Sequence, residues 1–334
     1  TPAMSEENKC AIHITWSSNS NWAYDWSVFC VNYSLSFDGD DDYVDMGDVD
    51  LLNMGSGSFT IQAWVKIDYN FSEIRAYPIV AKGSGDLGEG YRLQFGDSGT
   101  LRAYIKDGSS EIVLEGGNGN NESWNLIHAV FDRSANIGYL AFNGIKGQEY
   151  DITPTGDGDI SNNLPFILGE FSGHGLGWPH KMKGQIDEVV IWNSALSHNE
   201  ITALNGGLTP FSNSDGYVSS ESVIGYWNFN EGQGSSLTDI SGNENHGLIY
   251  GANWSDDAVN TTYTWEEGFQ PQTKEELQTA VNLWCSDSVS ALNTYGQINT
   301  WDVSLITDMA SLFQGKNTFN SDISNWDVSN VTTM

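Results

Sequence analysis

The strongest chemical signal in the sequence is a run of carboxylates, Asp38 and the residues 40–42, all Asp. The run is interrupted by Gly39 and lies between two strand patterns, so it predicts a tight acidic turn. Neighbouring carboxylates repel one another unless water or a shared cation stabilises them, and Ca²⁺ takes roughly 6–8 oxygen ligands. An EF-hand is excluded because its sixth position needs Gly, where this sequence has Tyr43. The turn is therefore a candidate calcium site, with a solvated acidic turn as the alternative.

A second candidate site lies in the glycine-rich stretch 172–180, which contains His174, Trp178 and His180. A saccharide site combines an exposed aromatic ring with nearby polar groups, and this stretch offers both. We therefore consider these three residues as a candidate carbohydrate-binding site. The alternative is that Trp178 packs over the edge of the domain.

The elements that carry these residues are short strands, which recur between Leu35 and about Ser255. The clearest alternating runs are residues 58–66, 91–95, 101–105 and 184–192, followed by 127–131, 138–142, 165–168, 224–229 and 247–254. Many short strands with turns between them predict a β-sandwich and a mainly β fold class.

Two helices are predicted. Ser197 and Glu200 form a capping box, and the glycines at 206–207 end this helix. The second helix begins at Thr273. Its apolar stripe is formed by Leu277, Val281, Trp284 and Cys285. We therefore expect Cys285 to be a buried thiol, with an intermolecular bridge as the alternative.

The C-terminal stretch contains a repeat of 25 residues. Its apolar positions are Ile298, Trp301, Val303, Ile306 and Met309, followed by Ile323, Trp326, Val328, Val331 and Met334. The spacing I-x-x-W-x-V matches the pattern of leucine-rich solenoids, which usually need at least about three units. Either further repeats follow in the parent protein, or another element covers the end of the stack.

The N-terminal residues predict a hairpin. Cys10 and Cys30 enclose two alternating runs, and a turn about Ser20 would bring them face to face. The same face carries six apolar side chains, Ile12, Ile14, Trp16, Tyr24, Trp26 and Val28. We predict a Cys10–Cys30 disulfide and hence an oxidising compartment, with two reduced buried cysteines as the alternative.

Composition limits the partners. The chain has 13 Lys+Arg and 44 Asp+Glu, a formal net charge of −31, so we expect neither nucleic acid nor an anionic membrane as a partner. No run approaches the roughly 18–20 apolar residues of a membrane span. The sequence begins with Thr1, which we interpret as a processed or partial product. Asn-x-Ser/Thr glycosylation candidates occur at Asn32, Asn70, Asn121, Asn253, Asn260 and Asn330.

These motifs carry two resemblances. The segments 35–44, 59–65, 184–192 and 225–232 resemble the laminin-G-like branch of the concanavalin-A-like jelly rolls. Residues 273–334 are similar to BspA-type surface-protein repeats with a helical cap, which implies a leucine-rich-repeat-like β-solenoid. We therefore expect a hairpin extension at 1–33, a jelly roll at 34–256, a linker at 257–272 and the cap with its first repeats at 273–334.

The jelly-roll resemblance implies a structural calcium ion between the acidic turn and the strand 184–192. Its expected ligands are Asp38, Asp41 or Asp42, and Asp187. An Asp on an otherwise apolar strand would be costly without a counterion, which supports Asp187 independently.

Catalysis is not expected. Related jelly rolls include glucanases, which carry paired carboxylates on one strand, whereas Asp187 and Glu188 are expected to point to opposite faces. The sequence also lacks the motifs of serine hydrolases, zinc proteases and phosphate-binding loops.

The leading hypothesis is a non-catalytic, secreted or cell-surface protein with an adhesive or architectural role. Its partners would be other protein subunits, including copies of itself in a filament, or extracellular glycans. Self-assembly would use the apolar hairpin and the open end of the repeats, unless the hairpin folds back onto the jelly roll. The alternative function is a carbohydrate-binding, lectin-like module.

Overall fold

The computed structural model describes residues 32–68, 76–83, 88–96, 98–119, 123–155, 158–171, 180–212, 216–259, 269–286, 301–316 and 326–333, and the single positions 291, 295, 298, 319 and 323. The predicted Cys10–Cys30 hairpin lies outside the described residues, so the disulfide and the filament stay predictions. His174 and Trp178 also lie outside them, as do Asn70, Asn121 and Asn260.

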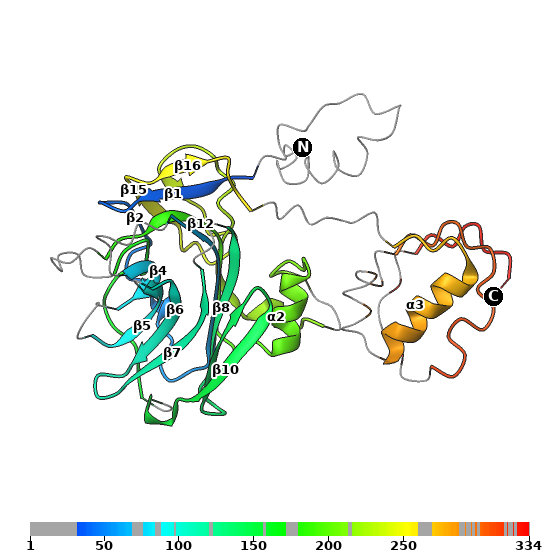
Figure 1. The fold of residues 1–334 in the computed structure, drawn as a ribbon, viewed down its shortest axis with the longest axis horizontal. Coiled ribbons are helices and arrows are strands. Elements are labelled where there is room, and N and C mark those ends of the chain that lie inside the picture. Colours follow the sequence, from blue (N-terminus) through cyan, green and yellow to red (C-terminus); the bar gives the residue numbers. More distant parts are fainter. Residues whose placement is uncertain are drawn as a thin grey trace.

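Two antiparallel sheets make up the larger part of the described chain (Figure 1). Sheet A has the order β10 (Ile145–Asp151), β9 (Ile137–Phe142), β8 (Asn125–Asp132), β3 (Phe59–Ile67), β12 (Lys183–Trp192), β1 (Ser34–Asp38) and β16 (Asn253–Ser255), and β13 (Val223–Trp227) also pairs with β12. Sheet B has the order β14 (Ser236–Leu237), β15 (Gly247–Tyr250), β2 (Tyr43–Asp45), β11 (Ile167–Leu168), β4 (Ala76–Lys82), β5 (Gly90–Gly96), β6 (Thr100–Lys106) and β7 (Glu111–Asn118). The predicted mainly β fold with two sheets is confirmed.

The core lies between the two sheets. Alternate residues along each strand point inward, because side chains alternate across a strand. On β3, Phe59, Ile61 and Ala63 are fully buried in this core, and on β6 the inward residues are Leu101 and Ala103. The alternate residues of the same strands point to the outer faces of the sheets.

The outer face of sheet A is covered by the helix α2 (His198–Asn205), which lies beside β8 and β10 in Figure 1. The predicted capping box is confirmed. The Ser197 side chain accepts a hydrogen bond from the backbone N–H of Glu200, and the Glu200 carboxylate accepts one from the backbone N–H of Ser197. The helix buries Ile201 and Leu204 against a second apolar cluster on this face.

The chain after β16 is also fixed on this face. Asp257 forms an ion pair with Lys66 at 2.5 Å. Its carboxylate also accepts a hydrogen bond from the indole N–H of Trp124 at 3.2 Å. Two residues later, the backbone N–H of Val259 donates to Asp187 at 3.1 Å. Residues 257–259 therefore hold the end of the sandwich across β3 and β12.

The C-terminal part contains the helix α3 (Lys274–Ser286), which buries Leu277, Ala280, Val281 and Trp284. The expectation of a buried Cys285 is wrong, because this thiol is exposed. At 100° per residue, Cys285 lies about 80° around the helix from Leu277, at the edge of the stripe. Ala280 occupies the buried position instead.

The two repeats lie in register, 25 residues apart. The rings of Trp301 and Trp326 are stacked with their centroids 6.1 Å apart. Asp308 and Thr333 form a parallel bridge, and the backbone N–H of Thr332 donates to the carbonyl of Thr307 at 2.8 Å. Equivalent positions of the two repeats thus contact each other directly, with α3 in the same apolar cluster.

Three short 3-10 helices complete the described elements, η2 (Asp50–Leu52), η3 (Thr153–Thr155) and η4 (Ser219–Ser222). Among the described residues, no helix has both the length and the apolar character needed to cross a membrane.

Candidate functional site

The outward residues of β5 and β6 form a polar surface on sheet B. Tyr91 and Leu93 point into the core, so the alternation turns Arg92 outward, and Tyr104 is outward on β6 between Ala103 and Ile105. The strand register pairs Arg92 directly with Tyr104. This cross-strand pair is the centre of the candidate site.

Arg92 is held in a fixed position by two rings. Its guanidinium carbon lies 3.9 Å from the ring centroid of Tyr104 and 5.6 Å from that of Phe171. Such cation–π contacts contribute about 0.5–2 kcal/mol each. The guanidinium also forms an ion pair with Glu111 on β7, with a nitrogen–oxygen distance of 3.4 Å. Arg92 is therefore a restrained side chain, and 16% of it is exposed.

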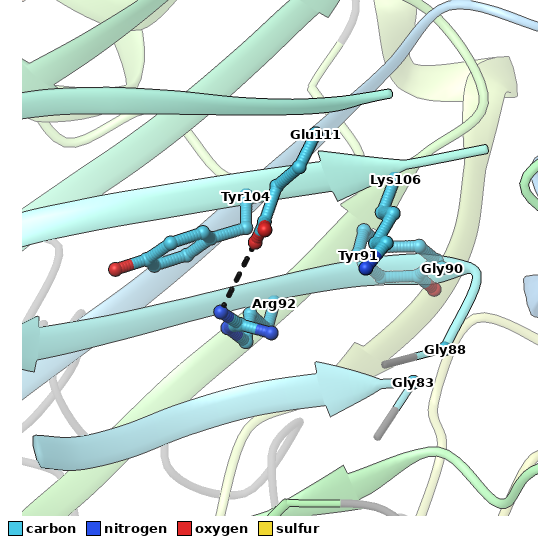
Figure 2. Close-up of a pocket in the computed structure, with 8 residues that line it drawn as sticks. All are labelled: Gly83, Gly88, Gly90, Tyr91, Arg92, Tyr104, Lys106 and Glu111. Atoms are coloured by element: carbon cyan, nitrogen blue, oxygen red, sulfur yellow. Dashed lines mark hydrogen bonds and ion pairs between the residues drawn. The ribbon is translucent and has the colours of Figure 1, made fainter. Parts of the chain in front are cut away.

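A small hollow opens beside this pair (Figure 2). Arg92 rises from β5, Tyr104 and Lys106 from β6, and Glu111 reaches across from β7 (Figure 2). The lining residues are Gly83, Gly88, Gly90, Tyr91, Arg92, Tyr104, Lys106 and Glu111. The hollow thus combines cationic donors, one carboxylate acceptor and an aromatic ring, which are the groups that recognise a small polar ligand.

His180, one of the predicted carbohydrate-binding residues, lies next to this surface. Its ring is 5.4 Å from that of Phe171, the ring that also contacts Arg92. Phe171 packs with Ala76 and Ala81 of β4, and His180 forms a parallel bridge with Ala76. Phe171 therefore links His180, the last residue of the predicted stretch, to Arg92.

The acidic turn brings three of its carboxylates together. Ligand oxygens of Asp38, Asp41 and Asp42 lie within 4.8 Å of one another. Asp42 is only 3% exposed, and burial raises the pKa of its carboxyl, an effect increased by repulsion from the other two despite a hydrogen bond from the Asp38 backbone. A cation would relieve this repulsion, so the donor set fits a hard divalent ion.

Asp187 does not join this cluster. In the β1–β12 register, Asp38 is opposite Lys183, whereas Asp187 lies four residues further along β12, roughly 13 Å away at the usual rise per residue. Asp187 is 2% exposed. One of its carboxylate oxygens accepts a hydrogen bond from the backbone N–H of Val259, and the other is buried without a hydrogen-bond partner among the described residues. Burial raises the pKa of Asp187 well above its usual range, and repulsion from Glu188 adds to the shift.

The expectation that Asp187 and Glu188 point to opposite faces is wrong. A bulge between Asp187 and Val190 adds a residue, and Glu188 has a φ of +50°. Glu188 consequently stays on the outer side of sheet A, where it accepts a short hydrogen bond from Tyr226. Both carboxylates are buried there, at 2% and 5% exposure, so neither is open to a substrate.

Three glycosylation candidates are within the described residues. Asn253 and Asn330 are exposed, while Asn32 is partly buried and donates to the carbonyl of Val259 at 3.2 Å. Glycosylation at the exposed pair is sterically easier, and all six positions stay predictions.

Comparison with known proteins agrees with the two-sheet fold of the sandwich. Residues 38–202 match the family described as the concanavalin A-like lectin/glucanases superfamily. The two-sheet sandwich is therefore similar in fold to a concanavalin-A-like jelly roll. Residues 277–334 match a family described as a Mycoplasma protein of unknown function. No curated protein matches the chain.

Solved structures similar to the jelly roll include a candidate carbohydrate-binding protein from Bacteroides ovatus ATCC 8483, with 17% identity, a TM-score of 0.50 and 67% of this chain covered. The match spans 60% of the length of that protein. A heptameric SAP-like pentraxin from Limulus polyphemus has 13% identity and a TM-score of 0.43, with 68% of this chain and 96% of the pentraxin covered. The CBM40 of a Ruminococcus gnavus sialidase has 17% identity and a TM-score of 0.38, with 46% of this chain and 84% of that module covered.

The Arg92 site was not predicted from the sequence. The alternation in residues 91–95 and 101–105 already places Arg92 and Tyr104 on outward positions. The missing information was the register that pairs them, together with Phe171, which comes from a distant part of the chain.

Proposed function

We propose that this chain is a non-catalytic extracellular binding protein whose jelly roll holds a saccharide on the outer face of sheet B. The observation that carries the proposal is the Arg92 guanidinium, restrained 3.9 Å from the Tyr104 ring beside a hollow that also contains Lys106 and Glu111. Sugar rings present axial hydrogens to an aromatic ring and hydroxyl groups to charged hydrogen-bonding side chains. The Bacteroides ovatus protein of the same fold, described as a candidate carbohydrate-binding protein, is compatible with this proposal.

The proposal is tested by screening the whole chain on a glycan array and measuring the affinity of each positive saccharide by calorimetry. Tyr104→Ala should weaken binding by about 1–2 kcal/mol, because the ring and its hold on Arg92 are lost. Tyr250→Ala is the matched control, since this tyrosine is 43% exposed and stacks on Tyr43 away from Arg92. The proposal fails if no saccharide binds, or if both variants bind like the wild type.

Calcium is proposed at the acidic turn, held by Asp38, Asp41 and Asp42. Millimolar Ca²⁺ should raise the melting temperature relative to a chelator, because an ion that binds only the folded state stabilises it. Asp42→Asn should abolish this response, whereas Asp187→Asn should retain it, since Asp187 lies outside the cluster. Equal melting temperatures with chelator and with calcium would exclude the site.

The C-terminal repeats are proposed to be BspA-type turns of a β-solenoid that extends the protein from the cell surface. The direct pairing of Thr307 with Thr332 and of Asp308 with Thr333 supports this proposal, because solenoid turns stack at equivalent positions. An adhesive role would then combine a saccharide-binding jelly roll with a repeat stalk.

A further inference from the structure

Resting on the proposed function, we infer that the saccharide is an acidic one, whose carboxylate or sulfate group binds Arg92 and Lys106 by displacing Glu111. Three features of the outer face of sheet B favour such a ligand: its charge, the restraint on Arg92 and the long ion pair of Glu111.

Charge is distributed unevenly over the chain. The whole sequence has 44 acidic residues against 13 Lys+Arg. The outward positions of β5 and β6 nevertheless carry Arg92, Arg102 and Lys106 and no acidic side chain. Among the described residues, Arg92 forms an ion pair with Glu111 and Arg102 forms one with Glu115, and both carboxylates come from the neighbouring edge strand β7. The outward positions of β5 and β6 are therefore more positive than the chain as a whole, which favours an anionic ligand there.

The Arg92 guanidinium is preorganised for binding an anion. Tyr104 and Phe171 restrain its guanidinium at 3.9 and 5.6 Å, so little side-chain freedom is lost when a ligand binds. A guanidinium binds carboxylate and sulfate oxygens through two parallel hydrogen bonds. Lys106 lies on the adjacent strand, two positions from Tyr104, and lines the same hollow. In the register it faces Gly90, so β5 presents no side chain opposite it.

Glu111 is held loosely. Its pair with Arg92 has a nitrogen–oxygen distance of 3.4 Å, compared with 2.7 Å between Arg102 and Glu115. The Glu111 side chain is 37% exposed, and exposed ion pairs of this kind contribute little. The strand register also places Glu111 opposite Lys106, so the same carboxylate lies near a second cation. A ligand anion can take the place of this carboxylate and leave Glu111 in water.

The inference is tested by calorimetry on the whole chain with three saccharides of equal length, oligogalacturonate, a sulfated heparin fragment and neutral oligogalactose. At least one acidic saccharide should bind about tenfold more tightly than the neutral one, and raising the salt concentration should weaken it. Arg92→Gln should weaken acidic binding about tenfold or more, through loss of charge-assisted hydrogen bonds. Glu111→Gln should strengthen it several-fold, because the competing carboxylate is removed.

Lys146→Gln is the matched control, because Lys146 also combines an ion pair, with Glu149, and a cation–π contact, with Tyr139, but lies on sheet A. It should leave binding unchanged, and melting curves establish that each variant folds. Equal affinity for neutral and acidic saccharides, or weaker binding by Glu111→Gln, would overturn the inference and leave the proposed function standing. If no saccharide binds, the proposed function itself fails.

Discussion

One buried histidine contributes to the response of the sandwich to pH. His128 of β8 is fully buried, and its Nε2 lies 2.9 Å from the side-chain oxygen of Gln62. Burial lowers the pKa of His128 to about 3, compared with its ordinary value of 6.5. The folded protein therefore keeps this ring neutral at pH values where the unfolded chain protonates it. The stability contributed by His128 is fully present above about pH 6.5 and is lost as the pH falls from there toward 3.

We predict that His128→Gln removes this loss of stability. Wild-type protein should lose about 1.4 kcal/mol of unfolding free energy per pH unit below 6.5 from this residue, about 2 kcal/mol between pH 7 and pH 5. Urea unfolding at the two pH values measures the difference. His198→Gln is the control, because His198 is exposed. If His128→Gln keeps the wild-type difference, the ring is protonated in the folded state.

At the scale of elements, α2 depends on one carboxylate. Glu200 is 7% exposed and accepts hydrogen bonds from Ser197 and from the Ser219 hydroxyl, the latter at 2.6 Å. Burial alone would raise the pKa of Glu200, but these hydrogen bonds outweigh it and hold the pKa below its ordinary value. The carboxylate thus joins the start of α2 to η4.

We predict that Glu200→Ala destabilises the sandwich more than Ser197→Ala does. Loss of the cap alone costs about 1 kcal/mol. Removing Glu200 also leaves the Ser219 hydroxyl and the Val218 N–H without their acceptor, so we expect about 2–3 kcal/mol. Glu221→Ala, at an exposed position of η4, serves as the control in urea unfolding. A smaller loss for Glu200→Ala than for Ser197→Ala would contradict this account.

Elements with a clear period were predictable from the sequence, and elements without one were not. β3 and β12 lie within one residue of the predicted runs 58–66 and 184–192. β4 was missed because all seven of its residues are buried and Pro78 interrupts the pattern. β7 and β10 were missed because they are edge strands with few buried residues, so no alternating apolar pattern marks them.

The candidate sites follow the same rule. The acidic turn was predictable because Asp38, Asp41 and Asp42 are close in sequence. The expected place of Asp187 beside them was not found. Its distance from Asp38 depends on the β1–β12 register, which puts Lys183 opposite Asp38. The Glu188 error came from a bulge, which reverses the alternation locally and leaves no mark in the sequence.

For the whole molecule, the sandwich and the C-terminal repeats have separate apolar clusters. The cluster around α3 contains Trp301 and Trp326, and none of its members belongs to the core between the sheets. The Trp326 ring stacks on Trp301, and its indole N–H donates to the carbonyl of Ile298 at 2.6 Å. This residue therefore joins the two repeats without a direct role in the jelly roll.

We predict that Trp326→Ala destabilises the repeats alone. Truncating a buried Trp costs about 3–5 kcal/mol, so limited proteolysis should cut the C-terminal part faster while the sandwich persists. Val328→Ala is the control, because Val328 is in the same repeat and 42% exposed. Equally rapid loss of the sandwich would show that the two parts unfold together.

The central claim is that the outer face of sheet B, around Arg92 and Tyr104, is a saccharide-binding site. It is tested most directly by a crystal structure of the whole chain with its best saccharide from the glycan array. The account predicts a sugar ring against Tyr104 with ligand oxygens on Arg92. A saccharide bound at another surface, with Arg92 and Tyr104 free of ligand, would contradict it.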